Sequence, residues 1–142
     1  MADYTIIAAS VQSSGTINGV TLGTNIALES ITAGQPLYLA TDGTVGLCTA
    51  TGTSITRVYY GTSLNGAATG QPVTVCRGDP SWTFGATIAA GQMVIVSSTA
   101  GKFCPVADKT TGWYVTPVGC GIGSNKIQLY PVGQLQASAA SV

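Results

Sequence analysis

Apolar and polar residues alternate with a period of two along most of the chain, which is the pattern of half-buried β-strands. In PLYLA (Pro36–Ala40), Leu37 and Leu39 share one face of the predicted strand, and Tyr38 lies on the other. Helix signals are almost absent, and the residues are rich in Thr, Val, Ile, Tyr and Gly, as in all-β proteins. Strands are predicted over residues 36–40, 57–64, 72–76, 82–88, 92–97, 112–120 and 126–132.

Turn residues separate these segments and support the same interpretation. Pro36 and Pro72 begin predicted strands, where a missing N–H disturbs the hydrogen-bond ladder least. Pairs that contain Gly, Asn, Asp or Pro are typical of tight turns. The predicted turns lie at Asp42-Gly43, Asn65-Gly66, Asp79-Pro80 and Gly121-x-Gly123.

One phrase occurs twice, as ITAGQPLYLATDGTVGLC from Ile31 to Cys48 and as IAAGQMVIVSSTAGKFC from Ile88 to Cys104. Each copy contains Gly-Gln, a strand, a turn and a second short strand, and TGQPVTV from Thr69 is an abbreviated third copy. Glycine permits an unusual backbone at the start of a strand, and the glutamine amide can bridge backbone groups there. We interpret the phrase as a strand–turn–strand unit that builds one barrel or sandwich; the alternative is a duplicated binding site.

Charge is scarce in this sequence. Only 7% of the 142 residues are charged, against about a quarter in typical domains. The five cations and five anions are scattered singly, so the chain lacks the Lys and Arg clusters that bind nucleic acid or an anionic membrane surface. We therefore expect no nucleic-acid and no membrane partner. A near-neutral surface is poorly protected against association, which suits a protein that works inside an assembly.

The sequence offers little for catalysis. It contains no histidine, and its one glutamate has no carboxylate near it in sequence, so acid–base and Cys–His nucleophilic chemistry have no evident residues. We predict no catalytic residue, no metal site and no cofactor, and therefore no enzyme. The cysteines contain no C-x-x-C spacing and are interpreted as buried reduced thiols, with disulfide pairing or a four-thiolate metal site as alternatives. They are Cys48, Cys76, Cys104 and Cys120.

Two further groups of residues have competing interpretations. Arg77-Gly78-Asp79 matches the integrin-recognition tripeptide, and with Pro80 it fits a turn equally well. Trp82, Phe84 and Trp113 are predicted to fill the core or an oligomer interface, with a sugar-stacking platform as the alternative.

Three longer stretches together resemble a known family. They are ITAGQPLYLATDGTVGLCTA, YYGTSLNGAATGQPVTVCRGD and the segment from FGATIAAGQMVIV to KIQLYPVG. This order resembles the small head decoration, or capsid cement, proteins of tailed bacteriophages. The most similar motifs are G-x-x-L-N-G-A-x-x-G-Q-P-V-T-V (Gly61–Val75), A-G-Q-x-V-x-V (Ala90–Val96), C-P-V-A-D (Cys104–Asp108) and G-W-Y-V from Gly112.

The resemblance implies a compact β-barrel or β-tulip module that forms a homotrimer. It implies a structural virion protein on the outer surface of the capsid, made in the host cytoplasm, whose partner is the major capsid protein. Its expected role is to stabilise the expanded head by cementing neighbouring capsomers. The runner-up function is a head-fibre, knob or tail-tip β module that binds carbohydrate on the host surface.

We divide the chain into an N-terminal arm with a polar spacer (1–28), a β domain (29–133) and a flexible C-terminal tail (134–142). The stretch DYTIIAASV is apolar and β-prone, and the polar spacer QSSGTINGVTLGTN sets it apart. We expect this arm to bind the capsid by adding a strand to an exposed sheet edge. The predicted capsid-binding residues are Asp3, Tyr4, Thr5, Ile6, Ile7 and Val11.

Overall fold

The computed structural model describes residues 3–14, 22–130 and 138–139 and confirms the all-β prediction, with two five-stranded antiparallel sheets in a sandwich-like fold. Short 3-10 turns η1 (Ala8–Ser10) and η3 (Val106–Asp108) are the helical elements of the described residues. The strands are β1 (Leu22–Ile26), β2 (Pro36–Leu39), β3 (Val45–Leu47), β4 (Gly61–Ser63), β5 (Pro72–Cys76), β6 (Asp79–Thr83), β7 (Met93–Val96), β8 (Phe103–Pro105), β9 (Tyr114–Val115), β10 (Pro117–Gly123), β11 (Lys126–Leu129) and β12 (Ser138–Ala139).

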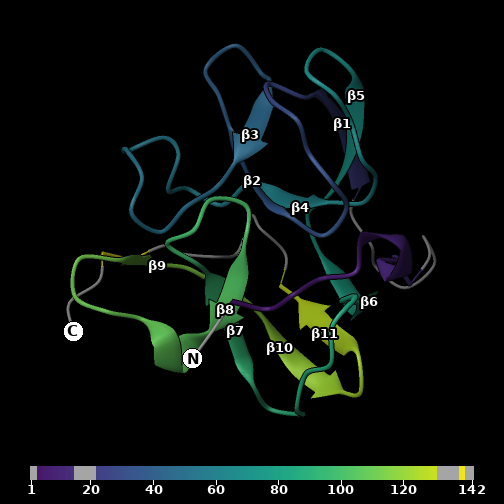
Figure 1. The fold of residues 1–142 in the computed structure, drawn as a ribbon, viewed down its shortest axis with the longest axis vertical. Coiled ribbons are helices and arrows are strands. Elements are labelled where there is room, and N and C mark those ends of the chain that lie inside the picture. Colours follow the sequence, from purple (N-terminus) through teal and green to yellow (C-terminus); the bar gives the residue numbers. More distant parts are fainter. Residues whose placement is uncertain (1–2, 15–21, 131–137, 140–142) are drawn as a thin grey trace.

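The two sheets have the same topology. The strand order is β1-β5-β4-β2-β3 in one sheet and β6-β11-β10-β7-β8 in the other, so each strand of the first has a counterpart in the second. We call them the first and second lobes; the first lies above the second in Figure 1. Leu22 and Asp79 begin equivalent strands, as do Pro36 and Met93, with an offset of 57 residues in both cases. The duplication inferred from one phrase therefore extends to all strands of the two five-stranded sheets.

The first lobe closes on itself through residues that directly follow β1. Ala27 forms a parallel bridge with Val45 of β3, and the Leu28 N–H donates to the Val45 carbonyl at 2.8 Å. The two outer strands of the sheet are thereby joined around a small apolar interior. That interior consists of Ala27, Ile31, Leu37, Val45, Ala67, Val73 and Val75.

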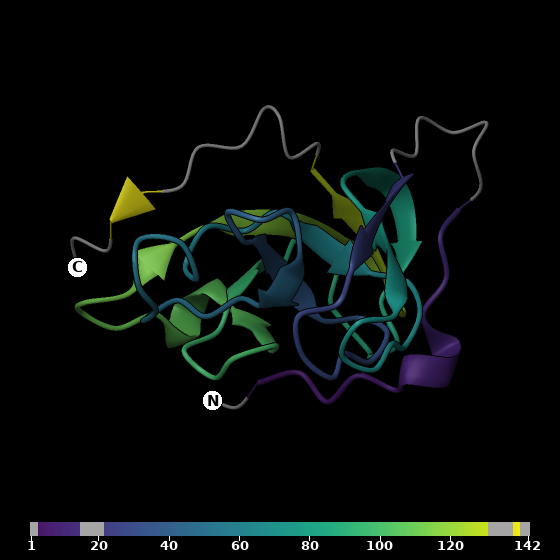
Figure 2. The ribbon, with the colours of Figure 1, turned by 90° about the horizontal axis from the view of Figure 1, so that it is seen from above.

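The second lobe is closed by the N-terminal arm instead. The Tyr4 N–H donates to the Phe103 carbonyl at 2.9 Å, which corresponds to the Leu28–Val45 bond of the first lobe. Further along the arm, Gln12 forms an antiparallel bridge with Thr83 of β6. The arm thus lies between the two outer strands of this sheet, and Figure 2 shows it running along the body of the molecule.

The larger core lies in the second lobe and continues onto one face of the first. Trp82, Phe84 and Phe103 are its largest fully buried side chains. Tyr38 and Cys76 reach the same cluster from the first lobe. One continuous apolar core across both lobes means that they are packed together as a single body.

The repeated phrase forms the expected strand–turn–strand units, the hairpins β2–β3 and β7–β8. The glycine at the start of each copy has a positive φ: 86° at Gly34, 86° at Gly70 and 82° at Gly91. Gln35 Oε1 accepts a hydrogen bond from the Thr32 N–H at 2.9 Å, and Gln71 Oε1 accepts one from the Ala68 N–H at 3.0 Å. The prediction that Gly-Gln serves the backbone is therefore confirmed. The first two copies show both the positive φ of the glycine and the hydrogen bond of the glutamine, and the third shows the positive φ.

Two turn predictions are wrong. Asp79-Pro80 lies inside β6, where Pro80 is exposed and Asp79 pairs with Leu129. Gly121-x-Gly123 lies inside β10, at a register irregularity with β11, and the chain reverses at Ser124, whose φ is 56°. Glycine in a strand often marks such a bulge, which explains why the sequence signal was misread as a turn.

Several predicted strands are shorter than expected or divided. Of residues 57–64, only the β4 residues form a strand, because residues 49–58 form a hydrogen-bonded loop that includes the Thr49 N–H bond to the Thr56 carbonyl. Residues 112–120 divide into β9 and the start of β10. β1 lies within the segment predicted to be the N-terminal arm and polar spacer, 1–28, and pairs with β5. Most of the predicted tail, 134–142, lies outside the described residues, but β12 within it pairs with β9.

Candidate functional site

The residues predicted to bind the capsid alternate between the body of the protein and solvent. Tyr4 packs its ring edge-to-face on Phe84, with centroids 5.1 Å apart. Val11 is only 7% exposed, and Ile6 packs against the same core. The Asp3 carboxylate accepts a hydrogen bond from the Ser97 hydroxyl at 2.6 Å. The side chains of four of the six predicted residues therefore contact the second lobe of their own chain.

Thr5 and Ile7 are the outward residues of this set. The Ile7 side chain is 62% exposed, the largest fraction among the large hydrophobic residues that the structure describes. Its N–H donates to the Gly85 carbonyl, so the backbone is held while the side chain faces solvent. Ile7 lines a shallow, open recess of about 370 Å³ together with Thr5, Ser10 and residues of the Gly85–Thr87 and Asn125 turns. This recess has no ionisable residue in its lining.

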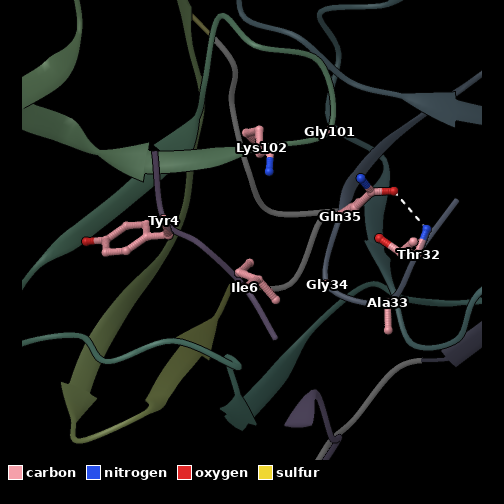
Figure 3. Close-up of a pocket in the computed structure, with 8 residues that line it drawn as sticks. All are labelled: Tyr4, Ile6, Thr32, Ala33, Gly34, Gln35, Gly101 and Lys102. Atoms are coloured by element: carbon pink, nitrogen blue, oxygen red, sulfur yellow. Dashed lines mark hydrogen bonds between the residues drawn. The ribbon is translucent and has the colours of Figure 1, made fainter. Parts of the chain in front are cut away.

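A second recess lies on the inner side of the arm (Figure 3). Its volume is about 40 Å³, which is room for a water molecule or two rather than for an organic ligand. Its lining joins the arm, the first Gly-Gln turn and the β7–β8 turn. The lining residues are Tyr4, Ile6, Thr32, Ala33, Gly34, Gln35, Gly101 and Lys102.

The aromatic residues singled out in the sequence are not gathered in one place. Trp82 and Phe84 are fully buried in the core, as predicted, so neither ring can stack on a sugar. Trp113 is half-buried in the segment before β9. Its neighbour Tyr114 lies beneath the Arg57 guanidinium, 4.5 Å from the ring centroid, and donates its N–H to the Ala50 carbonyl. The sugar-stacking platform of the three rings is therefore absent from this fold.

The Arg77-Gly78-Asp79 tripeptide is also used within the fold. Asp79 is 1% exposed and accepts hydrogen bonds from Ser81 N–H and from the backbone N–H and hydroxyl of Ser14. Arg77 lies over the Tyr60 ring and donates to the Tyr60 carbonyl at 3.0 Å. An integrin reads this tripeptide as an exposed acid–base pair, and here the acid is buried, so the adhesion interpretation is not supported.

Cys48, Cys76 and Cys104 are free and buried, as expected. Burial raises the pKa of the Cys48 and Cys104 thiols to about 12 and that of Cys76 to about 11, which keeps them protonated at neutral pH. Cys120, on β10, is free but partly exposed, so the prediction of a buried thiol is wrong for this residue. No group of three or more His, Cys, Asp or Glu side chains that could hold a metal ion is found in the described part of the chain.

The outer face of β1 and β5 carries an uncharged apolar surface that sequence reasoning missed. Leu22, Ile26 and Leu28 alternate with inward residues and are 40%, 43% and 41% exposed. Pro72, which pairs with Ile26 across the strands, is exposed on the same face. We call these four residues the β1 face. The alternation of Leu22, Thr24, Ile26 and Leu28 was a visible signal, but the segment was assigned to a polar spacer.

Comparisons with known proteins provide no further assignment: no protein-family model and no curated protein matches the chain. Among the residues that the structure describes, no helix is long and apolar enough to cross a membrane.

Proposed function

We propose that this chain is a structural virion protein that decorates the outer surface of a phage capsid and stabilises the expanded head by cementing neighbouring capsomers. The observation that carries the proposal is the surface. Large aliphatic side chains that are 40% or more exposed are spread over a protein in which only 7% of residues are charged. They are Ile7, Leu22, Ile26, Leu28, Leu39, Ile55, Val58 and Ile122.

Such a surface favours contact with other proteins, because exposed apolar area without nearby charge gains free energy when it is covered. A protein that cements a lattice needs several such contacts, because it must bind neighbouring capsomers at the same time to hold them together. The resemblance to decoration proteins and the all-β fold agree with this role. A homotrimer with the major capsid protein as its partner is part of the proposal, because three copies around one axis present identical contacts to a lattice.

The alternative, a fibre, knob or tail-tip module that binds carbohydrate, is disfavoured by the burial of Trp82 and Phe84. Sugar stacking needs accessible aromatic faces, and the half-buried Trp113 stands apart from these two rings. Screening the purified chain against host-surface glycans tests this alternative directly.

The cement role is tested with expanded shells assembled without this chain. The purified protein is expected to co-sediment with the shells at saturable occupancy and to raise the temperature at which they disrupt. Light scattering of the free chain is expected to give the mass of a trimer. Absence of co-sedimentation at micromolar concentrations contradicts the proposed function.

The predicted contact through the arm is tested by point substitution rather than by deletion. Removing residues 2–12 opens the second lobe, so lost binding after deletion has two explanations. Ile7→Ser changes only an exposed side chain, whereas Tyr4→Ala also removes core packing. If the arm contacts the shell, Ile7→Ser weakens co-sedimentation without lowering the melting temperature. Unchanged binding of Ile7→Ser contradicts the arm as a foot.

A further inference from the structure

Because the fold is duplicated, the β1 face can be compared with the equivalent positions of the second lobe. Leu22, Thr24 and Ile26 of β1 correspond to Asp79, Ser81 and Thr83 of β6, and Pro72 corresponds to Lys126. Both the Ile26–Pro72 pair and the Thr83–Lys126 pair join the first and last strands of their lobes. The same topology is therefore built once with polar residues at these positions and once with apolar ones.

In the second lobe these polar residues have partners within the chain. Lys126 Nζ donates to Thr83 Oγ1 at 2.8 Å, and Ser14 donates to the buried Asp79 carboxylate. The Thr83 N–H donates to the Gln12 carbonyl at 2.8 Å, so the arm lies along the edge of β6. The second lobe shows that neither folding nor closure requires apolar side chains here. It also shows that an extended segment can pair with this edge.

In the first lobe none of the described residues covers the corresponding surface. Successive N–H groups of a strand point to opposite sides, and the Ala27 N–H points toward the β5 side, to the Gln71 carbonyl at 2.9 Å. The N–H groups of Leu22 and Thr24 therefore point away from β5. No described residue pairs with these two N–H groups. The Asn25 side-chain amide donates to the Gly43 carbonyl at 3.1 Å, and the Leu28 N–H donates to the Val45 carbonyl beyond the end of β1. Within the described part of the chain, the unpaired edge thus runs from Leu22 to Thr24, beside the apolar β1 face.

We propose that the β1 face is a docking site for an extended, uncharged apolar segment of the shell protein, which pairs with the Leu22–Thr24 edge and covers Leu22, Ile26, Leu28 and Pro72. This inference rests on the proposed function and names the surface that performs it. The occupant is extended because the equivalent edge takes an extended segment, and it is uncharged because the β1 face offers no charge to pair with.

The size of the surface favours the shell protein over a second copy of the chain. A stable dimer buries about 800 Å² on each partner, from roughly 20 residues or more a side. The β1 face has four outward residues, two on β1, one directly after it and one on β5, which is too little to hold a dimer alone. It is sufficient as one of several contacts that bind together on a lattice, where linked sites multiply the overall affinity.

The test compares two lysine substitutions at exposed strand positions in the co-sedimentation assay. Ile26→Lys places a charge on the β1 face, and Gln128→Lys places the same charge on β11 of the other lobe, where Gln128 is exposed. Ile26→Lys is expected to weaken binding by about tenfold or more, because an unpaired charge would be buried, whereas Gln128→Lys is expected to bind within about twofold of the parent. Ile26→Thr, which introduces the residue type found at the equivalent position 83, serves as a fold-compatible second variant and is expected to weaken binding by several-fold.

The outcomes separate this inference from the proposed function. Binding of the parent chain with unchanged binding of Ile26→Lys and Ile26→Thr overturns the β1 face and leaves the cement role intact. Failure of the parent chain to bind overturns both. Slower amide hydrogen exchange of Leu22 and Thr24 on the shell supports pairing along this edge. If Ile26→Lys instead converts an oligomer of the free chain into monomers while shell binding is unchanged, the occupant is a second copy and the inference is wrong.

Discussion

The N-terminal arm is predicted to contribute to the stability of the second lobe, and Val11→Ala tests this most cleanly. Val11 is 7% exposed and packs closely against two glycines. A Cβ atom added to Gly34 would lie 2.9 Å from the Cγ2 atom of Val11, and one added to Gly85 would lie 3.1 Å from it. The substitution removes two buried methyl groups, each worth about 0.8 kcal/mol of transfer free energy. The cavity that remains adds to this loss, so the free energy of unfolding is expected to fall by about 2 kcal/mol.

The matched control is Ile7→Ala, four residues earlier on the same arm. Ile7 is 62% exposed, so Ile7→Ala removes more carbon atoms than Val11→Ala does, but those atoms face solvent and not the core. Its effect on the free energy of unfolding is expected to stay within about 0.5 kcal/mol. Urea unfolding followed by tryptophan fluorescence measures both, because the buried Trp82 reports on the second lobe.

For a chain of 142 residues, 2 kcal/mol corresponds to a decrease in melting temperature of roughly 7 °C. The urea dependence should keep its slope, because the arm unfolds together with the lobe that it closes. Equal stability of Val11→Ala and Ile7→Ala would refute the reasoning, since it would mean that the arm does not pack on the body in solution.

Three further predictions concern the glycines and the thiols. Gly34→Ala should lower the free energy of unfolding by about 2 kcal/mol more than Gly91→Ala, as measured by urea unfolding. Both glycines have φ above 80°, so the backbone strain is similar, but only at Gly34 would the new Cβ lie 2.7 Å from a side-chain atom of Ile6. Cys120 should react with a thiol reagent in the native state, whereas Cys48 and Cys104 should react only on unfolding, which mass spectrometry resolves; equal labelling of all three contradicts the burial. Burial raises the pKa of Cys48 and Cys104 from 9.0 to about 12, so the thiols of the unfolded chain ionise first as pH rises. The free energy of unfolding should therefore hold up to about pH 9 and fall between pH 9 and 12. In unfolding measured against pH, a Cys48→Ala, Cys104→Ala variant should show a shallower decline.

Local signals in the sequence predicted the hairpins well. The Gly-Gln phrase specifies a left-handed glycine followed by a strand, and a hairpin depends on contacts between residues close in sequence. The buried thiols and the core position of Trp82 also followed from residue type, since these side chains are usually buried. By contrast, Gly121 and Gly123 carry the same signal in a bulge as in a turn, and only the partner strand distinguishes the two.

The arm and the β1 face depended on contacts between residues far apart in sequence. The period-two pattern of Tyr4, Thr5, Ile6 and Ile7 was visible, but the sequence does not say whether such a strand pairs with its own chain or with another protein. The same pattern in β1 was overlooked for the opposite reason. Alternation shows that a strand has two different faces, but it does not show which one faces solvent, and in β1 the apolar residues lie outside.

The duplication explains why function is best sought where the two lobes differ. Positions that the fold requires keep their character in both copies, as the glycines at 34 and 91 do. Where the copies diverge without a structural need, another constraint has acted. The β1 face is one such place, and the closure of each lobe is another: the first uses its own Leu28, and the second uses the arm from Tyr4 onward. The proposed capsid-binding role accounts for the first difference, since it needs an apolar edge that the described residues leave uncovered.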